Sequence, residues 1–341
     1  MQKVLAARAI QGSNSIEGYN VSVEDAVAAI EGNEPREATG DDWAAVASYR
    51  RAMTFVLQLA RSNSFQHSGA TLQSLHFMMT EYDLDASPGL WRSGPIWIQN
   101  ELSGDIVYEG PDHEQLPDLI DSLVEQLDSA LDESGMIRGA MAHLNLVMIH
   151  PFRDGNGRMA RCLQTLVLAR EGILVPEFCS SEEYLGRNTQ AYYDVLANVG
   201  QGRWNPGNDA RPWIRYCLRA HYVQAASVLR RVRESEKIWG FLEDTVAAAG
   251  IPERAIEALF DASLGMRVTN SSYRTSVKRS DHEISKQTAT TDLAQMVKAN
   301  LLEKQGSKRG TSYVGSSELV AFYADLRRQR TSINTEQLFE P

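Results

Sequence analysis

Residues 150–161 read His150-Pro151-Phe152-Arg153-Asp154-Gly155-Asn156-Gly157-Arg158-Met159-Ala160-Arg161. This stretch indicates both the fold and the site of the chain. It combines a base, a carboxylate, a turn bracketed by two glycines and two arginines on one predicted helix. Apolar residues recur at helical spacing on both sides, so the sequence predicts a turn between two buried helices. This set of groups indicates a site for a polyphosphate and a divalent metal.

The predicted turn has defined ends. Pro151 disfavours helical geometry at the residue before it, so the first helix should end at His150, with that side chain facing the turn. Gly155 and Gly157 permit backbone angles and close approaches that other residues resist. The second helix should begin at Asn156, and the unpaired N–H groups at its start favour a bound anion.

Three charged side chains complete the predicted site. Arg158 and Arg161 are three residues apart on the second helix, so they share a face and can reach one anion together. Asp154 is an oxygen ligand suited to Mg²⁺, which binds through few carboxylates plus substrate phosphates. Each residue also has a plain structural interpretation, as a helix cap, a turn residue or a solvated helix face. Their combination in one turn favours the functional interpretation.

The stretch also matches every specified position of a family signature: histidine, any residue, phenylalanine, any residue, an acidic residue, Gly-Asn-Gly-Arg, two of any residue, and arginine. It therefore resembles the active-site loop of Fic proteins. The resemblance implies a mainly α fold, in which a Fic-type helical bundle carries a β-hairpin flap. It also implies an enzyme that transfers AMP from ATP to a hydroxyl side chain of a protein and releases diphosphate.

The resemblance assigns a role to each charged position of the loop. His150 would be the general base that takes the proton of the target hydroxyl, a role that suits a histidine near neutral pH. Asp154 would hold Mg²⁺ against the phosphates of ATP. Asn156, with the loop amides, would bind the α-phosphate, and Arg158 and Arg161 would hold the β- and γ-phosphates.

Further nucleotide-binding residues follow from the same resemblance. Arg153 and Gly155 belong to the loop, and Gly157 favours AMP transfer because a relative that phosphorylates its target has lysine there. Asn188 and Tyr192 lie on a predicted helix at the place where relatives line the adenine pocket. A tyrosine at helical spacing is more often a core residue, and that alternative stays open.

A second motif, Ser13-Asn14-Ser15-Ile16-Glu17-Gly18, lies far from the loop. On its residues alone, Ser13 would cap a short helix that ends at Gly18, and Glu17 would be exposed. The motif also resembles the inhibitory-helix signature of Fic proteins. That resemblance implies that the Glu17 carboxylate competes with the γ-phosphate for Arg161 and holds the enzyme in an autoinhibited state, with Ser13 and Glu17 as regulatory residues.

A β-hairpin is expected just before the loop. Residues 96–98 and 106–108 are β-prone runs separated by a polar stretch with Gly104. Fic proteins place a flap hairpin beside the active site, where it pairs with the backbone of the target segment. The alternative is a small structural hairpin packed on the helical core.

The chain is expected to have three parts: an N-terminal segment over 1–36 with the inhibitory helix, a Fic catalytic core over 37–228, and a linker helix with a winged-helix domain over 229–341. Residues 266–315 hold nine lysines and arginines against four aspartates and glutamates. A helix over 285–300 and a wing over 306–314 resemble a winged-helix domain. Such domains bind DNA or dock proteins, and both alternatives stay open.

Composition bounds the remaining expectations. The chain has 341 residues, 43% of them hydrophobic, and a net charge of −10, so as a whole it is no generic nucleic-acid binder. Cys162, Cys179 and Cys217 lack metal-ligand spacing, and we expect them reduced and mostly buried. With no signal peptide and no long apolar span, a cytoplasmic location without membrane contact is expected.

Two alternative functions are weighed against AMP transfer. One is a DNA-binding regulator whose Fic core senses nucleotide, and the other is an enzyme whose main activity is removal of AMP. The intact signature favours the transferase, because a decayed site would tolerate loss of His150 or Asp154. The expected partners are ATP, Mg²⁺ and a protein substrate. Modification of the chain itself and a homodimer stay open. The modified side chain, Tyr, Thr or Ser, stays open.

Overall fold

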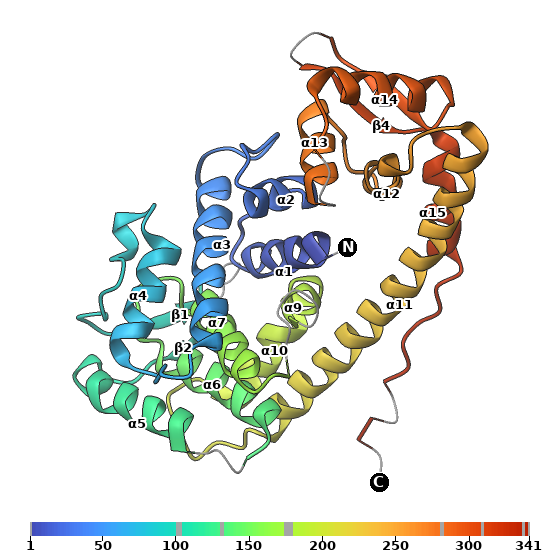
Figure 1. Cartoon of the computed structure of the whole chain (residues 1–341). Coiled ribbons are helices and arrows are strands. Elements are labelled where there is room, and N and C mark those ends of the chain that lie inside the picture. Colours follow the sequence, from blue (N-terminus) through green and yellow to red (C-terminus); the bar gives the residue numbers. More distant parts are fainter. Residues whose placement is uncertain are drawn as a thin grey trace. The chain divides into compact units, whose positions relative to one another are not determined.

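The computed structural model describes residues 2–99, 104–129, 133–173, 180–279, 283–307, 310–335 and 338–339, and these are mostly α-helical (Figure 1). In this part of the chain, the β-strands form two antiparallel two-stranded sheets. The predicted mainly α fold is therefore confirmed. Contacts divide the chain into two compact units, one formed by Met1–Val228 with Asn334–Pro341 and the other by Leu229–Ile333.

The first unit contains most of the helices and one hairpin. Its elements are, in chain order, α1 (Gln2–Ile16), α2 (Val23–Glu31), α3 (Gly40–Arg61), α4 (Gly69–Thr80), η1 (Leu84–Ala86), β1 (Trp97–Gln99), β2 (Ile106–Glu109), η2 (His113–Gln115), α5 (Leu116–Ser129), α6 (Gly135–Ile149), α7 (Asn156–Arg170), α9 (Glu182–Arg187), α10 (Thr189–Gly200) and the first part of α11 (Arg211–Ala249).

Helix α7 is the centre of the first unit. Nearly every residue from Asn156 to Leu168 is buried, because α3, α4 and α6 all pack against it. The core continues where α6 meets α10 and α11. There the indole N–H of Trp213, a fully buried side chain, donates to the carbonyl of Ala140 at 2.7 Å. The turn between α6 and α7 is thus built into the most densely packed part of the unit.

Helix α1 is longer than its sequence motif suggested. The prediction that Ser13 caps a short helix is wrong, because α1 runs from Gln2 to Ile16 and Ser13 lies in its last turns. Its apolar face, which includes Val4 and Ile10, is buried and makes the long helix stable. Where α1 crosses α9, Gly12 has no room for a side chain, since a Cβ there would lie 2.5 Å from the backbone oxygen of Glu182.

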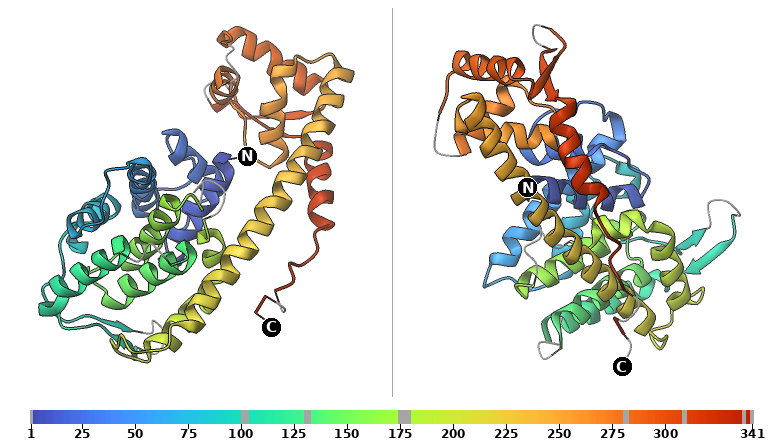
Figure 2. Two further views of the ribbon diagram at one scale, coloured as in Figure 1. Left: turned by 60° about the horizontal axis from the view of Figure 1, so that its bottom comes forward. Right: turned by 90° about the vertical axis from the view of Figure 1, so that its right-hand side faces the viewer.

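The predicted hairpin is present. Strands β1 and β2 are antiparallel, with Ile98 opposite Tyr108 in the register, and Figure 2 shows them projecting from the helices of the first unit. Tyr108 is buried, and its hydroxyl donates to the carbonyl of Met148 on α6 at 2.7 Å. The exposed apolar side chains of the hairpin are Trp97, Ile98, Ile106 and Val107.

The second unit is a small helical module with a second hairpin. It holds the rest of α11, then η3 (Glu253–Ala255), α12 (Ile256–Ser263), α13 (Asn270–Arg279), α14 (Lys286–Lys298), β3 (Leu302–Gln305), β4 (Ser312–Gly315) and α15 (Ser317–Arg328). Val268, between α12 and α13, forms an antiparallel bridge with Tyr313 on β4. Ser285 caps α14 by accepting from the N–H of Thr288 at 3.0 Å.

Two further expectations concern the cysteines and the membrane. Cys162 and Cys217 are buried free thiols, whereas Cys179 lies outside the described residues. Among the helices that the structure describes, none has both the length and the apolar composition that a membrane crossing requires.

The crossing of α1 and α9 can be tested by Gly12→Ala. Because the added methyl overlaps the backbone of α9, we expect the free energy of unfolding to fall by about 1–3 kcal/mol in chemical denaturation. Gly94→Ala is the control, since a Cβ at Gly94 meets nothing within 4 Å and its φ is not positive. Equal stability of the two variants would contradict the close crossing.

Candidate active site at the turn between α6 and α7

His150 ends helix α6 in the geometry that its sequence context predicts. Its φ of 51° is left-handed, and Pro151 follows directly. The ring Nδ1–H donates to the carbonyl of Val147 at 3.0 Å, which leaves the lone pair on Nε2. Burial lowers the pKa of His150, and the nearby cation of Arg92 lowers it further. The ring is therefore neutral at neutral pH and able to accept a proton at Nε2.

Arg92 ties the turn to both ends of the hairpin. Its Nε donates to the carbonyl of His150 at 2.9 Å, while its two terminal nitrogens donate to the carbonyls of Gly94 at 2.7 Å and Pro111 at 2.5 Å. The Arg92 backbone N–H also donates to the carbonyl of Pro151 at 2.9 Å. Arg92 could not be predicted from the sequence, because an arginine in a loop carries no signal of the four carbonyls around it.

Helix α4 supports the turn from the other side. The ring of His76 stacks on the fully buried Phe152 with centroids 3.8 Å apart, and its Nε2–H donates to the carbonyl of Asp154 at 2.9 Å. The N–H of Gly89 donates to its Nδ1 at 2.9 Å, so both ring nitrogens are used. Burial lowers the pKa of His76 to about 4, which keeps this strut neutral.

The side chain of Asn156 closes the turn on itself. Its Oδ1 accepts from the N–H of Phe152 and its Nδ2 donates to the carbonyl of Phe152, both at 2.9 Å. Gly155, with φ 75°, caps α7 without a side chain. Because the Asn156 amide is committed to the loop, the backbone N–H groups at the start of α7 are the donors left for an anion.

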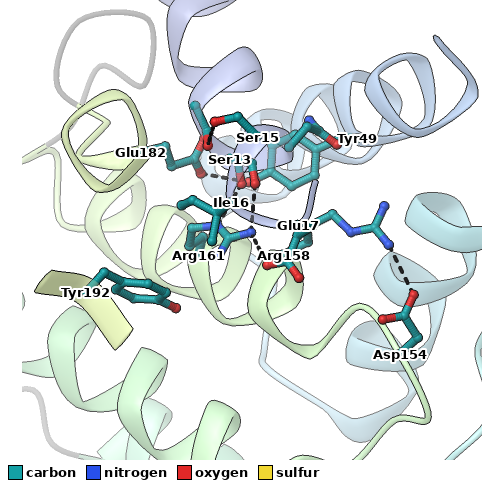
Figure 3. A network of polar contacts seen from close by, with 12 residues as sticks. Ser13, Ser15, Ile16, Glu17, Tyr49, Asp154, Arg158, Arg161, Glu182 and Tyr192 are labelled. Carbon is teal, nitrogen blue, oxygen red and sulfur yellow. Dashed lines mark hydrogen bonds and ion pairs between the residues drawn. The ribbon is translucent and has the colours of Figure 1, made fainter. Parts of the chain in front are cut away.

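Asp154 and Arg158 form the outer part of the site. The Asp154 carboxylate is 52% exposed and lies 3.6 Å from Arg158 Nη2, whereas the Arg158 side chain is 1% exposed. Arg158 also donates to the hydroxyl of Tyr82 at 3.0 Å, and its guanidinium lies over the ring of Tyr19 at 5.1 Å. Arg153 is exposed. Figure 3 shows Arg158 reaching toward Asp154.

Arg161 forms the inner part of the site, where helix α1 meets α7. Its Nε donates to Ser13 Oγ at 2.7 Å, and its Nη2 donates to the Ser13 carbonyl at 2.9 Å and to Glu17 Oε1 at 2.7 Å (Figure 3). The Arg161 side chain is 1% exposed and that of Glu17 is 22% exposed. Ser13 and Glu17 of the N-terminal motif thus both contact Arg161 of the loop signature.

Gly157 provides the space that Glu17 occupies. A Cβ on Gly157 would overlap Glu17 Oε1 and lie 3.1 Å from Arg161 Nη1. The absence of a side chain at this position therefore permits the ion pair between Glu17 and Arg161. The close approach expected at Gly157 is thus present, and the group that approaches is the Glu17 carboxylate.

A second buried carboxyl lies in the same network and was also missed. Glu182 Oε1 accepts from the hydroxyl of Tyr49 at 2.7 Å, and both side chains lie close to Ser13 (Figure 3). Burial raises the pKa of Glu182 to about 7, although its hydrogen bond from Tyr49 and the cation of Arg161 oppose the rise. An acidic residue at the start of a short helix gives no sequence signal of such burial.

Asn188 lies apart from the loop residues in its contacts, whereas the hydroxyl of Tyr192 also interacts with the guanidinium of Arg161. Asn188 sits between α9 and α10, and its Nδ2 donates to the carbonyl of Tyr184 at 2.8 Å. Tyr192 is 1% exposed, and its hydroxyl is 2.9 Å from His143 Nε2 in the aromatic core. Their place in an adenine pocket stays a prediction. Tyr193 instead contacts α1, donating to the Ile16 carbonyl at 3.0 Å.

Metal binding at the site would depend on Asp154. Within the part of the chain that the structure describes, there is no group of three or more His, Cys, Asp or Glu side chains arranged to hold a metal ion. A single half-exposed carboxylate beside a helix N-terminus fits Mg²⁺ that is shared with substrate phosphates.

Comparison with known families agrees with this geometry. The family model described as Fic/DOC matches residues 68–168, from the N-cap of α4 to the last turn of α7. Residues 68–168 are a Fic domain. The turn with His150 and the two buried arginines lies wholly inside the matched segment.

Relatives of the Fic domain are named as adenylyltransferases. Protein adenylyltransferase fic-1 of Caenorhabditis briggsae is 37% identical over 106 residues, which cover 30% of this chain and 18% of that protein. Protein adenylyltransferase Fic of Aedes aegypti is 39% identical over 77 residues, which cover 23% and 13%. The chain spans less than a fifth of the length of these relatives, and the likeness concerns the Fic domain.

Solved structures share the fold. A Fic family protein from Desulfovibrio desulfuricans G20 matches 93% of this chain and 87% of its own length, with a TM-score of 0.57 at 19% identity. A Fic domain containing signaling protein from Bacteroides thetaiotaomicron VPI-5482 matches 65% and 86%, with a TM-score of 0.53 at 20% identity. These likenesses confirm the predicted Fic-type helical fold.

The contact between Gly157 and Glu17 can be tested by a double-mutant cycle. We expect Gly157→Ala to lower the free energy of unfolding by about 1–3 kcal/mol, because the methyl overlaps the carboxylate. In a Glu17→Ala background the same change should be neutral or stabilising, since alanine favours a helix over glycine by about 1 kcal/mol. Urea denaturation of the four proteins gives the coupling energy, and additive effects would contradict the contact.

Proposed function

We propose that the chain is a protein adenylyltransferase that transfers AMP from ATP to a hydroxyl side chain of a protein. The observation that carries this proposal is the neutral His150, whose Nδ1–H is bonded to Val147 so that Nε2 keeps its lone pair, six residues before the uncapped start of α7. The names of the Fic-domain relatives support it. Which side chain is modified, Tyr, Thr or Ser, depends on the protein that docks.

The chain's own residues would do two things in this reaction: accept a proton and hold negative charge. The target hydroxyl oxygen forms a bond to the α-phosphorus, and its proton passes to His150 Nε2. The bond between the α-phosphorus and the bridging oxygen breaks, so diphosphate leaves with the electron pair. The N–H groups at the start of α7, with Arg158 and Arg161, would hold the charge that builds on the phosphates.

A magnesium ion fits the same site. Asp154 would hold it together with the phosphates, because its carboxylate is half exposed and stands at the mouth of the turn. When bound, Mg²⁺ neutralises phosphate charge and orients the diphosphate leaving group. Arg158, 3.6 Å away, places a second positive charge beside the same carboxylate.

Autoinhibition by Glu17 is part of the proposal. The Glu17 carboxylate takes the donor of Arg161 that the γ-phosphate would need, and Ser13 takes two more of its hydrogen bonds. The two hydrogens of Arg161 Nη2 are both used, one by the Ser13 carbonyl and one by Glu17, so a γ-phosphate at this nitrogen would have to replace the Glu17 carboxylate. ATP therefore binds productively only when Glu17 moves aside.

Removal of AMP is the second candidate activity. The specific observation in its favour is the Glu17 carboxylate itself, which is 22% exposed and lies against Gly157 within the loop. A carboxylate there would activate water as a general base. The same protein would then add or remove AMP according to the position of Glu17.

The remaining partners follow from other surfaces. The exposed apolar side chains of the β1–β2 hairpin would contact the target segment while its backbone pairs with a strand edge. The second unit would be a winged-helix module, as its order of helices and strands suggests. Two buried free thiols suit a reducing compartment such as the cytoplasm. A homodimer stays a prediction.

Labelled ATP with Mg²⁺ tests both the activity and its inhibition. We expect Glu17→Gly to transfer about tenfold to a hundredfold more AMP to protein than wild type, the range that corresponds to the loss of one charged hydrogen bond. Adding His150→Ala to Glu17→Gly should abolish the label. Glu34→Gly, a change at an exposed glutamate of the N-terminal segment, is the matched control. Equal labelling by wild type and Glu17→Gly would contradict autoinhibition.

A pulse of label separates addition from removal. Protein labelled by Glu17→Gly is purified and incubated with unlabelled wild type or Glu17→Gly. Faster loss of label with wild type would establish AMP removal as its main activity, whereas no loss with either protein would leave transfer alone.

Arg92 should position the base without binding substrate. In the Glu17→Gly background we expect Arg92→Lys to lower kcat at least about tenfold, because lysine cannot span the carbonyls and small misplacements of a catalytic group are costly. KM for ATP should change little, since Arg92 faces backbone carbonyls. Arg219→Lys, at an exposed arginine of α11, is the control. An unchanged kcat in a folded Arg92→Lys protein would contradict the positioning role.

A further inference from the structure

The second unit has the element order of a winged helix. Helix α12 is followed by the bridge of Val268 with Tyr313, then by α13, α14 and the β3–β4 hairpin. In this order α13 and α14 form a helix-turn-helix pair, and α14 is the helix that such modules present to a ligand. The identity of the ligand depends on the outward face of α14.

The acidic side chain of α14, Asp292, lies on the inward face of the helix and is buried. Ala289, Leu293 and Met296 are buried in the core of the unit, and Asp292 lies among them with 3% exposure. The Asp292 carboxylate accepts from Arg254 Nε at 2.8 Å and Nη2 at 3.0 Å, and from the Tyr273 hydroxyl at 2.9 Å. These bonds fix the helix and neutralise its carboxylate.

The outward face of α14, every residue of which the structure describes, carries neither a carboxylate nor a large apolar side chain. Short or hydrogen-bonding groups fill its middle and a lysine stands at each end. The residues exposed on this face are Lys286, Gln287, Thr290, Thr291, Ala294, Gln295 and Lys298. An apolar protein groove would find little to bury on such a face, so its composition disfavours docking of that kind.

Charge favours a polyanion as the partner. Residues 229–333 hold 17 lysines and arginines against 13 aspartates and glutamates, whereas the rest of the chain holds 17 against 31. Exposed cations also stand on the elements beside α14, at Arg274 and Lys278 on α13 and at Lys304 on β3. Two exposed carboxylates, Glu283 and Glu303, lie before the helix and on β3 rather than on its outward face.

We propose that the second unit binds double-stranded DNA, with the outward face of α14 in the major groove. A major groove about 12 Å wide admits an α-helix, and its base edges present donors, acceptors and thymine methyl groups. Gln287 and Gln295 can hydrogen-bond to base edges, and Ala294 can meet a methyl group. The hydroxyls of Thr290 and Thr291 donate to carbonyls of their own helix. Lys286 and Lys298 would contact phosphates on either side. The proposal does not depend on AMP transfer by the first unit.

Fluorescence anisotropy of the full chain with a labelled 30-base-pair random duplex tests the proposal, over about 50–300 mM KCl. We expect wild type to bind with an affinity that falls steeply with salt. Lys286→Ala/Lys298→Ala should weaken binding at least about tenfold at low salt and make the slope of log K against log salt shallower by about 2. Arg233→Ala/Lys237→Ala, which removes two exposed charges from α11, should leave the slope near that of wild type.

A second variant tests base contacts. With duplexes enriched by repeated selection on the wild-type chain, Gln287→Ala/Gln295→Ala should relax the preference at one or two base pairs and leave the salt slope unchanged. Three results would overturn the proposal: no binding of duplex by wild type at 50 mM KCl, equal losses for the α14 and α11 double variants, or equal affinity for single-stranded DNA of the same length.

Discussion

A buried guanidinium is the constraint on which the first unit depends. Arg161 projects from the middle of the central helix, where it is 1% exposed, and a charge in that position is tolerated only when it is paired and hydrogen-bonded. The partners come from α1, which supplies a hydroxyl and a carbonyl, and from Glu17 just past its end, which supplies a carboxylate, all within 3 Å. The N-terminal helix thus completes the electrostatics of a core helix that lies more than a hundred residues away along the chain.

The second constraint is the rigidity of the turn that carries His150. Three side chains hold the turn by hydrogen bonds to its backbone. Arg92 donates to the His150 carbonyl, and His76 donates to the Asp154 carbonyl. The amide of Asn156 bonds both the N–H and the carbonyl of Phe152. A base held in this way needs little structural reorganisation when a substrate binds, and this is the basis of electrostatic preorganisation. Of the charged side chains that would face ATP, Asp154 is half exposed, whereas Arg158 and Arg161 are buried and hydrogen-bonded within the unit.

Much of the site could be predicted from the sequence, because its signals are local. The ends of α6 and α7 follow from Pro151 and Gly155, and the hairpin follows from two β-prone runs. Contacts between distant segments left no such signal. The four carbonyls around Arg92 and the burial of Glu182 against Tyr49 come only from the packing of separate elements.

The motif at Ser13 shows how local chemistry can mislead. A serine after glycine is a good helix cap when the chain before it is not helical, but here apolar residues on α1 bury against α9 and extend the helix backward to Gln2. Tertiary burial outweighed the capping preference. The serine then used the same hydroxyl for Arg161 instead of for a backbone N–H of its own helix.

The tight crossing at Gly12 bears on how the site opens. Backbone meets backbone there, since Gly186 on α9 would also clash with Gly12 if it had a side chain, and Tyr193 holds the last carbonyl of α1. Releasing the whole helix would expose this interface and most of the apolar face of α1 to water. Moving the Glu17 side chain, which stands just past the helix end, requires only the exchange of one ion pair for another. If Glu17 inhibits as proposed, a change of its side-chain rotamer would therefore release Arg161 while α1 stays packed against α9.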